Sequence, residues 1–236
     1  MTRYVVESLS FDSTVIATSM VYWHTFVCQH GLRKIDEIVL SASCVFLASK
    51  VEHYKVRLNK VIALVFEINL RSEEVEGWRR MLLETELLLC HTLGFSFQVT
   101  HPMKRIAEMV PQNDQAVFEC AHRLFHLSFV TPLCTRVSTD EVAEALVYLA
   151  ADGANRLDTL AGRFTCTSPE RRDGIICMMI DAMVVMKKTT GFPKIDDAIS
   201  ASRKRFRDKE PSCPLPSRSS AGIASSSETP CVQDVE

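Results

Sequence analysis

Apolar residues recur at helical spacing through most of the chain. In the first such stretch they form one stripe of Ile16, Met20, Trp23 and Val27. The helices predicted for the first half cover about residues 13–30, capped by Ser13 and stopped at Gly31, then 36–52, 58–68 and 72–94. The segment 36–52 is apolar nearly all round, which is typical of a helix that others surround. We therefore expect it to be the central helix of a first core.

The pattern is interrupted at His101-Pro102, because proline is tolerated in the first turn of a helix and not in its interior. Beyond this point the predicted helices cover about residues 102–110, 114–128, 138–151 and 169–188, and the stretch 153–167 has no clear period. Residues 211–230 are rich in proline and serine and cannot bury enough apolar surface to fold. The sequence thus predicts an all-α protein with two consecutive helical domains, 1–100 and 101–190, and a flexible tail, 191–236.

The composition adds several exclusions. Only eight of the 236 residues are glycine, which disfavours architectures with many tight turns. A net charge of −2 provides no general field to attract nucleic acid. The nine cysteines include no C-x-x-C pair, which indicates reduced thiols and argues against a zinc site. We find no signal peptide and no apolar run long enough for a membrane span, so we expect a soluble, intracellular protein.

Two charged residues stand in otherwise apolar helices. Lys50 follows the run Val45-Phe46-Leu47-Ala48-Ser49, and Glu86 stands between two groups of leucines. Lysine and glutamate are seldom buried unless they are paired. One interpretation is that both side chains extend to solvent from the edge of the core. The other is that they lie side by side on the rim of one domain and present paired charges that fix the register of a partner.

Four segments, in order, resemble the cyclin box. They are Ala17-Thr18 with Tyr22-Trp23-His24-Thr25-Phe26, then Ala48-Ser49-Lys50-Val51-Glu52, then Glu86-Leu87-Leu88 with Leu93-Gly94-Phe95, and finally His101-Pro102. Their order and spacing match the family over roughly residues 3–110. The second domain resembles the C-terminal cyclin repeat mainly in size and helical pattern. The motifs A-T-x-x-x-Y and L-A-S-K-V-E and the His-Pro pair are most similar to the transcription-associated branch, to cyclins K and Q and also to cyclins L and T.

This resemblance implies a regulatory subunit that binds and activates a cyclin-dependent protein kinase as a heterodimer. Such a subunit contributes no catalytic group and needs no cofactor. Lys50 and Glu86 correspond to the family's lysine and glutamate that hold the regulatory C-helix of the kinase and nearby backbone. The positions that correspond to the apolar part of that contact are Val51, Cys90, Phe95 and Phe97. Binding would push the C-helix inward and complete the ion pair of the kinase between its own lysine and glutamate.

Some features depart from the family or add to it. The first helix, predicted from Arg3 to Leu9, is short, and His53 stands where many relatives have a second glutamate. A basic cluster in the tail fits a nuclear localisation signal or, equally well, a solvated helix end. The cluster consists of Arg203, Lys204, Arg205 and Arg207. From the branch and this cluster we expect a nuclear protein that can also be present in the cytoplasm.

A different class of protein shares the paired cyclin-like fold. A DNA-binding transcription factor of the TFIIB type would show a zinc ribbon and a strongly basic core, and the sequence has neither. The common enzyme signatures, such as the P-loop, are also absent. His122 and His126 are spaced as two metal ligands can be, but without a third ligand ordinary packing is the better interpretation. We expect no metal, no direct nucleic-acid contact and no membrane contact.

Overall fold

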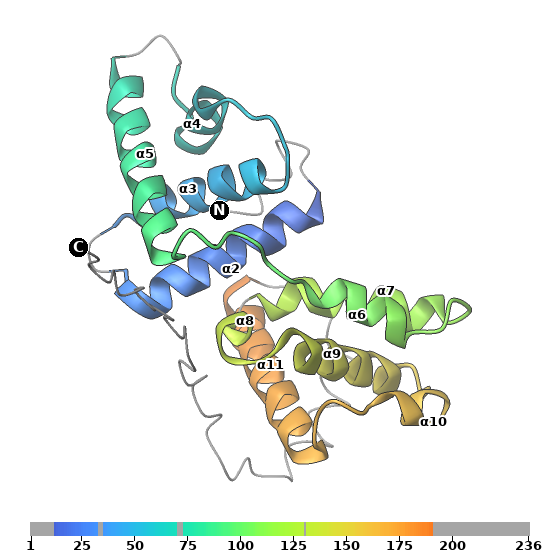
Figure 1. The fold of residues 1–236 in the computed structure, drawn as a ribbon. Coiled ribbons are helices and arrows are strands. Elements are labelled where there is room, and N and C mark those ends of the chain that lie inside the picture. Colours follow the sequence, from blue (N-terminus) through green and yellow to red (C-terminus); the bar gives the residue numbers. More distant parts are fainter. Residues whose placement is uncertain (1–11, 33–34, 70–72, 130, 191–236) are drawn as a thin grey trace, which may run out of the picture.

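The computed structural model of the protein describes residues 12–32, 35–69, 73–129 and 131–190, with the backbone alone for 185–190. Every regular element in these ranges is helical, as predicted (Figure 1). The first half contains α2 (Ser13–His30), α3 (Glu37–Val51), α4 (Leu58–Phe66) and α5 (Glu74–Thr92). The second half contains α6 (Pro102–Met109), α7 (Gln115–Ser128), α8 (Leu133–Arg136), α9 (Thr139–Gly153), α10 (Leu157–Leu160), the 3₁₀ helix η1 (Ala161–Arg163) and α11 (Pro169–Thr190). The predicted helix Arg3–Leu9, the tail and its basic cluster lie outside the described residues.

Local chemistry sets the helix ends close to their predicted positions. At the start of α3, Asp36 caps the helix, and its Oδ1 accepts a hydrogen bond from the N–H of Ile38 at 2.7 Å. Ser138 and Glu141 form a reciprocal capping box at the start of α9. The predicted cap of α2, Ser13, is wrong by one residue. Asp12 has the extended backbone that a cap needs, and its carboxylate accepts from the N–H of Ser13 at 2.5 Å.

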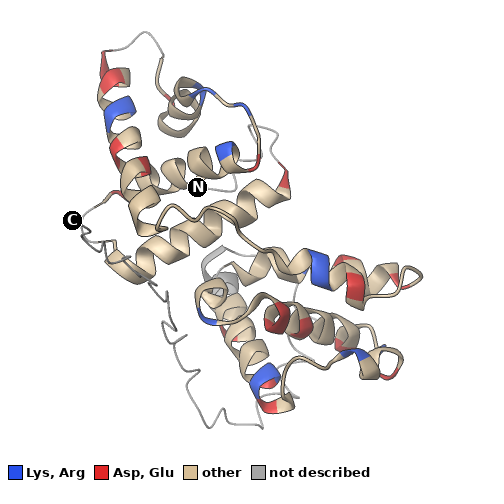
Figure 2. Cartoon of the chain, in the orientation of Figure 1, with Lys and Arg blue, Asp and Glu red and all other residues tan. Residues whose placement is uncertain are grey.

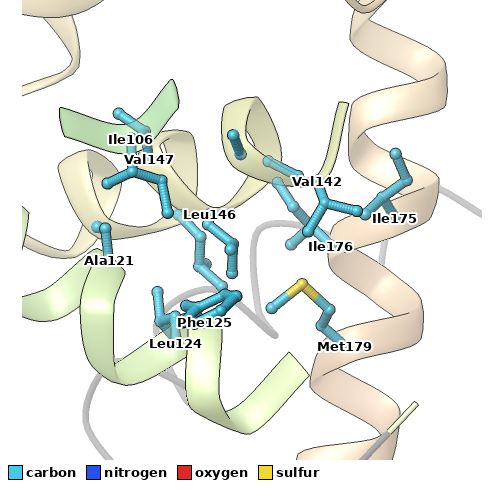
Figure 3. Packing of buried hydrophobic residues seen from close by; sticks show 14 of the residues in the cluster. Ile106, Ala121, Leu124, Phe125, Val142, Leu146, Val147, Ile175, Ile176 and Met179 are labelled. Atoms are coloured by element: carbon cyan, nitrogen blue, oxygen red, sulfur yellow. The ribbon is translucent and has the colours of Figure 1, made fainter. Parts of the chain in front are cut away.

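Two clusters of buried apolar side chains hold these helices together. The first is built from α2, α3, α4 and α5, with α3 at its centre, where every residue from Val39 to Ser49 is buried. The prediction of a central helix is therefore confirmed. The second cluster is built mainly from α6, α7, α9 and α11. Figure 3 shows Phe125 of α7, Leu146 of α9 and Met179 of α11 pointing toward one another in its interior.

Helix α2 belongs to both clusters. Tyr22 and Phe26 pack in the first cluster, whereas Ala17 is fully buried in the second. The sequence of α2 contains no lysine, arginine, aspartate or glutamate, and Figure 2 shows the helix without a charged position. A helix packed from two sides has no solvent-facing stripe for charged residues. This arrangement makes α2 the structural connection between the halves.

The double packing of α2 also changes which of its residues are buried. The predicted stripe, Ile16, Met20, Trp23 and Val27, is only partly buried. Three polar residues are buried instead: Thr18, Ser19 and His24. The hydrophobic period assumes one apolar face, so it cannot identify a helix whose opposite side packs on another core.

The helices that the sequence did not predict are short. α8 and α10 contain four residues each, too few to display a helical period, and η1 contains three. α8 follows Pro132 and packs against α2 as well as α9. α10 and η1 occupy the stretch 153–167, for which no clear element could be predicted.

Candidate functional site

The two isolated charges of the sequence form an ion pair at the edge of the first core. Nζ of Lys50, in the last turn of α3, lies 2.6 Å from Oε1 of Glu86 in α5. The Lys50 side chain is 48% exposed and the Glu86 side chain 12%. The ammonium group also lies 4.1 Å from the ring centroid of Phe46, a cation–π contact. Glu86 is thus a nearly buried anchor that holds a lysine facing solvent, and the side-by-side arrangement is the observed one.

Apolar side chains continue this surface along α5. Leu83 and Cys90 are three and four residues from Glu86, so they lie on the same face of the helix. Leu87 lies between them, and Leu83 and Leu87 are 45% and 58% exposed. Leu88 is 39% exposed but points away, because residues two apart on a helix face opposite sides. The surface beside the ion pair is therefore apolar and open.

Phe95 extends the same surface beyond the end of α5. Gly94 and Phe95 have φ values of 58° and 57°, and the Phe95 N–H donates to the carbonyl of Cys90 at 3.0 Å. The Phe95 ring is 59% exposed and makes edge contacts with His91 and Phe97, at centroid distances of 5.2 and 6.3 Å. A positive φ costs a residue with a side chain about 1–3 kcal/mol. An exposed aromatic side chain on a residue with a strained backbone is typical of a contact residue.

The remaining predicted site residues are half-buried. Val51, Cys90 and Phe97 pack against the first core and leave part of their side chains at the surface. Burial and the Glu86 carboxylate raise the pKa of the Cys90 thiol, and the opposing effect of Lys50 is smaller. Cys90 therefore stays protonated at neutral pH and acts as an apolar group.

Sequence reasoning missed Leu83 and Leu87 as parts of this surface, and it missed Phe46 as the buried ring beneath the Lys50 ammonium group. Leu87 had a signal that could have identified it. In the run Leu87-Leu88-Leu89 only one residue can face the core of an amphipathic helix, and the structure buries Leu89. The exposed apolar residues that result require an explanation, and a partner provides one.

A second set of polar contacts joins α2 to the end of α3 and the start of α6. Thr18 Oγ1 donates to Oε1 of Glu52 at 2.6 Å and lies 2.8 Å from Nε2 of His101. The one hydroxyl proton goes to the carboxylate, so the imidazole is the donor in the second contact. Thr18 is fully buried, and Glu52 follows Lys50 by two residues. The network therefore reaches the lysine end of α3.

Two further side chains of α2 hydrogen bond to backbone carbonyls elsewhere. The Tyr22 hydroxyl donates to the carbonyl of Phe97 at 2.6 Å, and Nε2 of His24 donates to the carbonyl of Phe129 at 2.7 Å. Burial, followed by the Glu52 carboxylate, raises the pKa of Tyr22 well above its usual value. The phenol is therefore protonated and remains a donor at any physiological pH.

The imidazoles of His24, which is buried, and of His101, which is half-buried, predict that the protein loses stability in mild acid. Burial lowers the pKa of His24 and of His101 below 6.5, against smaller opposing effects of the Phe129 carbonyl and Glu52. The contribution of the two neutral imidazoles to stability is complete above the unfolded-state pKa of 6.5. Below it the unfolded chain binds protons that the folded chain does not, so stability falls toward the folded-state pKa values, by at most about 1.4 kcal/mol per pH unit per histidine.

Urea unfolding between about pH 7.5 and pH 5.5, above the range in which most carboxylates titrate, measures this loss. We expect the free energy of unfolding to decrease over this range in the natural chain and to change less in the His24→Gln/His101→Gln variant. Equal slopes for the two proteins would show that the imidazoles are not responsible.

One other sequence feature, the pair His122 and His126, receives no functional support from the geometry. The rings of His122 and His126 pack edge to face at 4.8 Å, and the described ranges contain no group of three or more potential metal ligands. Among the helices that the structure describes, none combines the length and apolar character that a bilayer span requires.

Comparison with known proteins gives the site a context. Residues 3–98 match the cyclin N-terminal domain family. The chain is 27% identical over 157 residues to Cyclin-T1-4 and 30% identical over 157 residues to Cyclin-L1-1, both from Arabidopsis thaliana, and 28% identical over 153 residues to Cyclin-C of Rattus norvegicus. Each match covers 61% of this chain, and the relatives are covered over 29%, 38% and 55% of their own lengths.

A solved structure shares the fold. A chain of the CAK complex from Chaetomium thermophilum, bound to ATP-gamma-S, superposes with a TM-score of 0.56, over 86% of this chain and 66% of that one. The identity is 17%, so this likeness concerns the fold alone. Every regular element that the structure describes is helical, and the paired charges lie in the part of the chain that matches the cyclin N-terminal domain family.

The match of residues 3–98 and the likeness to cyclins T, L and C confirm the resemblance of the chain to cyclins. Cyclins T and L, which the sequence motifs resemble, are among the relatives. The likeness to cyclins K and Q stays a prediction. These matches give no support to the alternative of a TFIIB-type factor.

Proposed function

We propose that the chain is a non-catalytic regulatory subunit that binds and activates a cyclin-dependent protein kinase. The partner would bind the α3–α5 surface, which consists of Lys50, Val51, Leu83, Glu86, Leu87, Cys90, Phe95 and Phe97. The observation that carries this proposal is the Lys50–Glu86 ion pair, which borders exposed leucines within a cyclin N-terminal domain.

The chemistry of this surface suits a helix of a partner. Exposed Leu83, Leu87 and Phe95 provide the apolar area, and complete burial of such side chains contributes about 1.5–3 kcal/mol each. Lys50 and Glu86 add orientation, because charges at an interface set register more than affinity. If the kinase C-helix has an inward and an outward position, this surface binds the inward one better and shifts the population toward the active state.

We further propose that the protein belongs to the transcription-associated branch and acts in the nucleus. The A-T-x-x-x-Y and L-A-S-K-V-E motifs and the likeness to cyclins T, L and C support this assignment. In this proposal the chain is organised as two domains, 1–100 and 101–190, of which only the first provides the kinase contact.

One pair of substitutions on α5 tests the proposed surface. Leu83→Asp places a charge beside the ion pair, whereas Leu88→Asp places the same charge at a similarly exposed position on the opposite side of the helix. We expect Leu83→Asp to reduce co-purification of cyclin-dependent kinases by at least about tenfold, because it would bury a charge without a partner. Leu88→Asp should retain the kinase.

The measurement is quantitative mass spectrometry of kinases that co-purify with tagged natural and variant chains, together with their activity on a peptide substrate. The proposal is wrong if the natural chain retains no cyclin-dependent kinase. The assignment of the surface is wrong if Leu83→Asp and Leu88→Asp retain equal amounts.

A further inference from the structure

The A-T-x-x-x-Y motif of α2 places two hydroxyl groups on one side of a buried helix. Thr18 and Tyr22 are four residues apart, so they stand one above the other on the same face. Thr18 is fully buried, and Tyr22 is 1% exposed. Neither residue reaches the exposed α3–α5 surface, so the proposed kinase contact does not by itself explain why these positions carry hydroxyls.

One hydroxyl has its partner beside that surface, and the other has its partner within it. Thr18 bonds to Glu52, two residues after Lys50, at 2.6 Å. Tyr22 bonds to the carbonyl of Phe97 at 2.6 Å, in the segment that follows α5. The two bonds therefore connect one rigid helix to the lysine end of α3 and to the aromatic segment beyond α5.

His101 extends the connection toward the second half of the chain. Its Nε2 donates to Thr18 at 2.8 Å, immediately before α6 begins at Pro102. Ala17, the small residue of the motif, is fully buried in the second core cluster. The motif residues thus pack α2 against the second half of the chain. They also bond α2 to two parts of the first half, the lysine end of α3 and the segment beyond α5.

We propose that Thr18 and Tyr22 are positioning residues that hold the Lys50 end of α3 and the Phe95–Phe97 segment at the spacing that the kinase contact requires. This inference rests on the proposed function. Hydroxyls provide what apolar groups of the same shape do not, because a hydrogen bond is directional and fixes an orientation as well as a distance. A valine or phenylalanine would fill the same volume and leave Glu52 or the Phe97 carbonyl without its bond.

The test removes the hydroxyls while preserving shape. The variants are Thr18→Val and Tyr22→Phe, and the matched control is Thr25→Val, because the Thr25 hydroxyl donates to the carbonyl of Val21 within its own helix and to no other segment that the structure describes. Each protein is titrated against a purified cyclin-dependent kinase that binds the natural chain, and Kd, kinase activity and Tm are measured. We expect Kd to increase about tenfold or more for Thr18→Val and Tyr22→Phe, and to stay within about twofold for Thr25→Val, since loss of one hydrogen bond changes an equilibrium by about this factor.

A second control separates positioning from general stability. His24→Leu loses the bond to the Phe129 carbonyl, which joins α2 to the second half without touching the α3–α5 surface. If the two hydroxyls position the surface, only Thr18→Val and Tyr22→Phe weaken kinase binding when variants with an equal loss of Tm are compared. Thr18→Ser, which keeps the hydroxyl, should bind the kinase like the natural chain. If binding follows Tm in all variants, or if the two variants bind like Thr25→Val, the inference is wrong.

The outcome also distinguishes this inference from the proposed function. If the natural chain binds no cyclin-dependent kinase, both fail. If it binds, and Leu83→Asp weakens binding whereas Thr18→Val does not, only the positioning role fails.

Discussion

Replacing Lys50 by glutamate is expected to weaken kinase binding by about 100-fold or more. Truncating one charge of a hydrogen-bonded pair that an interface buries costs about 2–5 kcal/mol, and reversing the Lys50 charge toward the kinase adds repulsion. The fold should remain intact. Lys50 is half-exposed, so loss of the pair itself costs about 0–1 kcal/mol of stability, and the second carboxylate beside the nearly buried Glu86 adds a further, smaller loss than complete burial would. The variant therefore separates binding from folding, and calorimetric titration with a purified kinase, alongside urea unfolding, measures both.

The swapped pair, Lys50→Glu with Glu86→Lys, provides the decisive control. It restores an internal ion pair between α3 and α5 but presents the opposite charge pattern to the partner. If the pair recognises the kinase, the double variant regains stability and not binding. If the pair serves only the internal structure of the chain, the double variant regains both, and the partner role of Lys50 is wrong.

The largest effect on stability is expected from Arg172→Ala in the second half. The Glu144 carboxylate is only 1% exposed, and its Oε2 accepts from the N–H of Cys166 at 2.8 Å. Arg172 provides the opposing charge, with Nη1 3.6 Å from the other carboxylate oxygen, and its guanidinium lies 4.0 Å from the Tyr148 ring centroid. Without it a carboxylate is buried with no compensating charge, which costs about 3–5 kcal/mol.

The neighbouring arginine is the matched control. Arg171 pairs with Glu141, but this pair is more exposed, and its loss through Arg171→Ala should cost about 1 kcal/mol or less. Chemical denaturation of both variants measures the difference. Adding Glu144→Gln to Arg172→Ala should recover part of the loss, because a neutral amide is less costly to bury. Equal costs for the two arginines would contradict a buried charge pair.

Much of the fold could be predicted because helix periods and helix ends depend on nearby residues. Asp36 and Pro102 start helices through their own backbone and side-chain chemistry, and α3 is apolar all round because it is surrounded. The buried polar residues of α2 could not be predicted. Thr18 and His24 are buried because distant segments, ending at Glu52 and Phe129, provide their hydrogen-bond partners. No local pattern contains this information.

The candidate site was predictable only in part for the same reason. Lys50 and Glu86 were conspicuous because charges are rare in apolar helices, and their pairing across 36 positions follows from how α3 packs against α5. Leu83 was not conspicuous, because leucine in a helix normally indicates a core position, and the run Leu87-Leu88-Leu89 does not say which of its residues are exposed. Their exposure became evident only once the packing had shown which face of α5 is buried.

The most direct test of the central claim uses purified components. The chain is mixed with each of a panel of purified transcription-associated cyclin-dependent kinases. Light scattering measures complex formation, and phosphorylation of a peptide substrate measures kinase activity. The proposed function predicts that at least one kinase forms a one-to-one complex and gains activity, and that Lys50→Glu prevents both. If no kinase of the panel binds, or if a kinase is activated equally by Lys50→Glu, the assignment of this surface to kinase activation is contradicted.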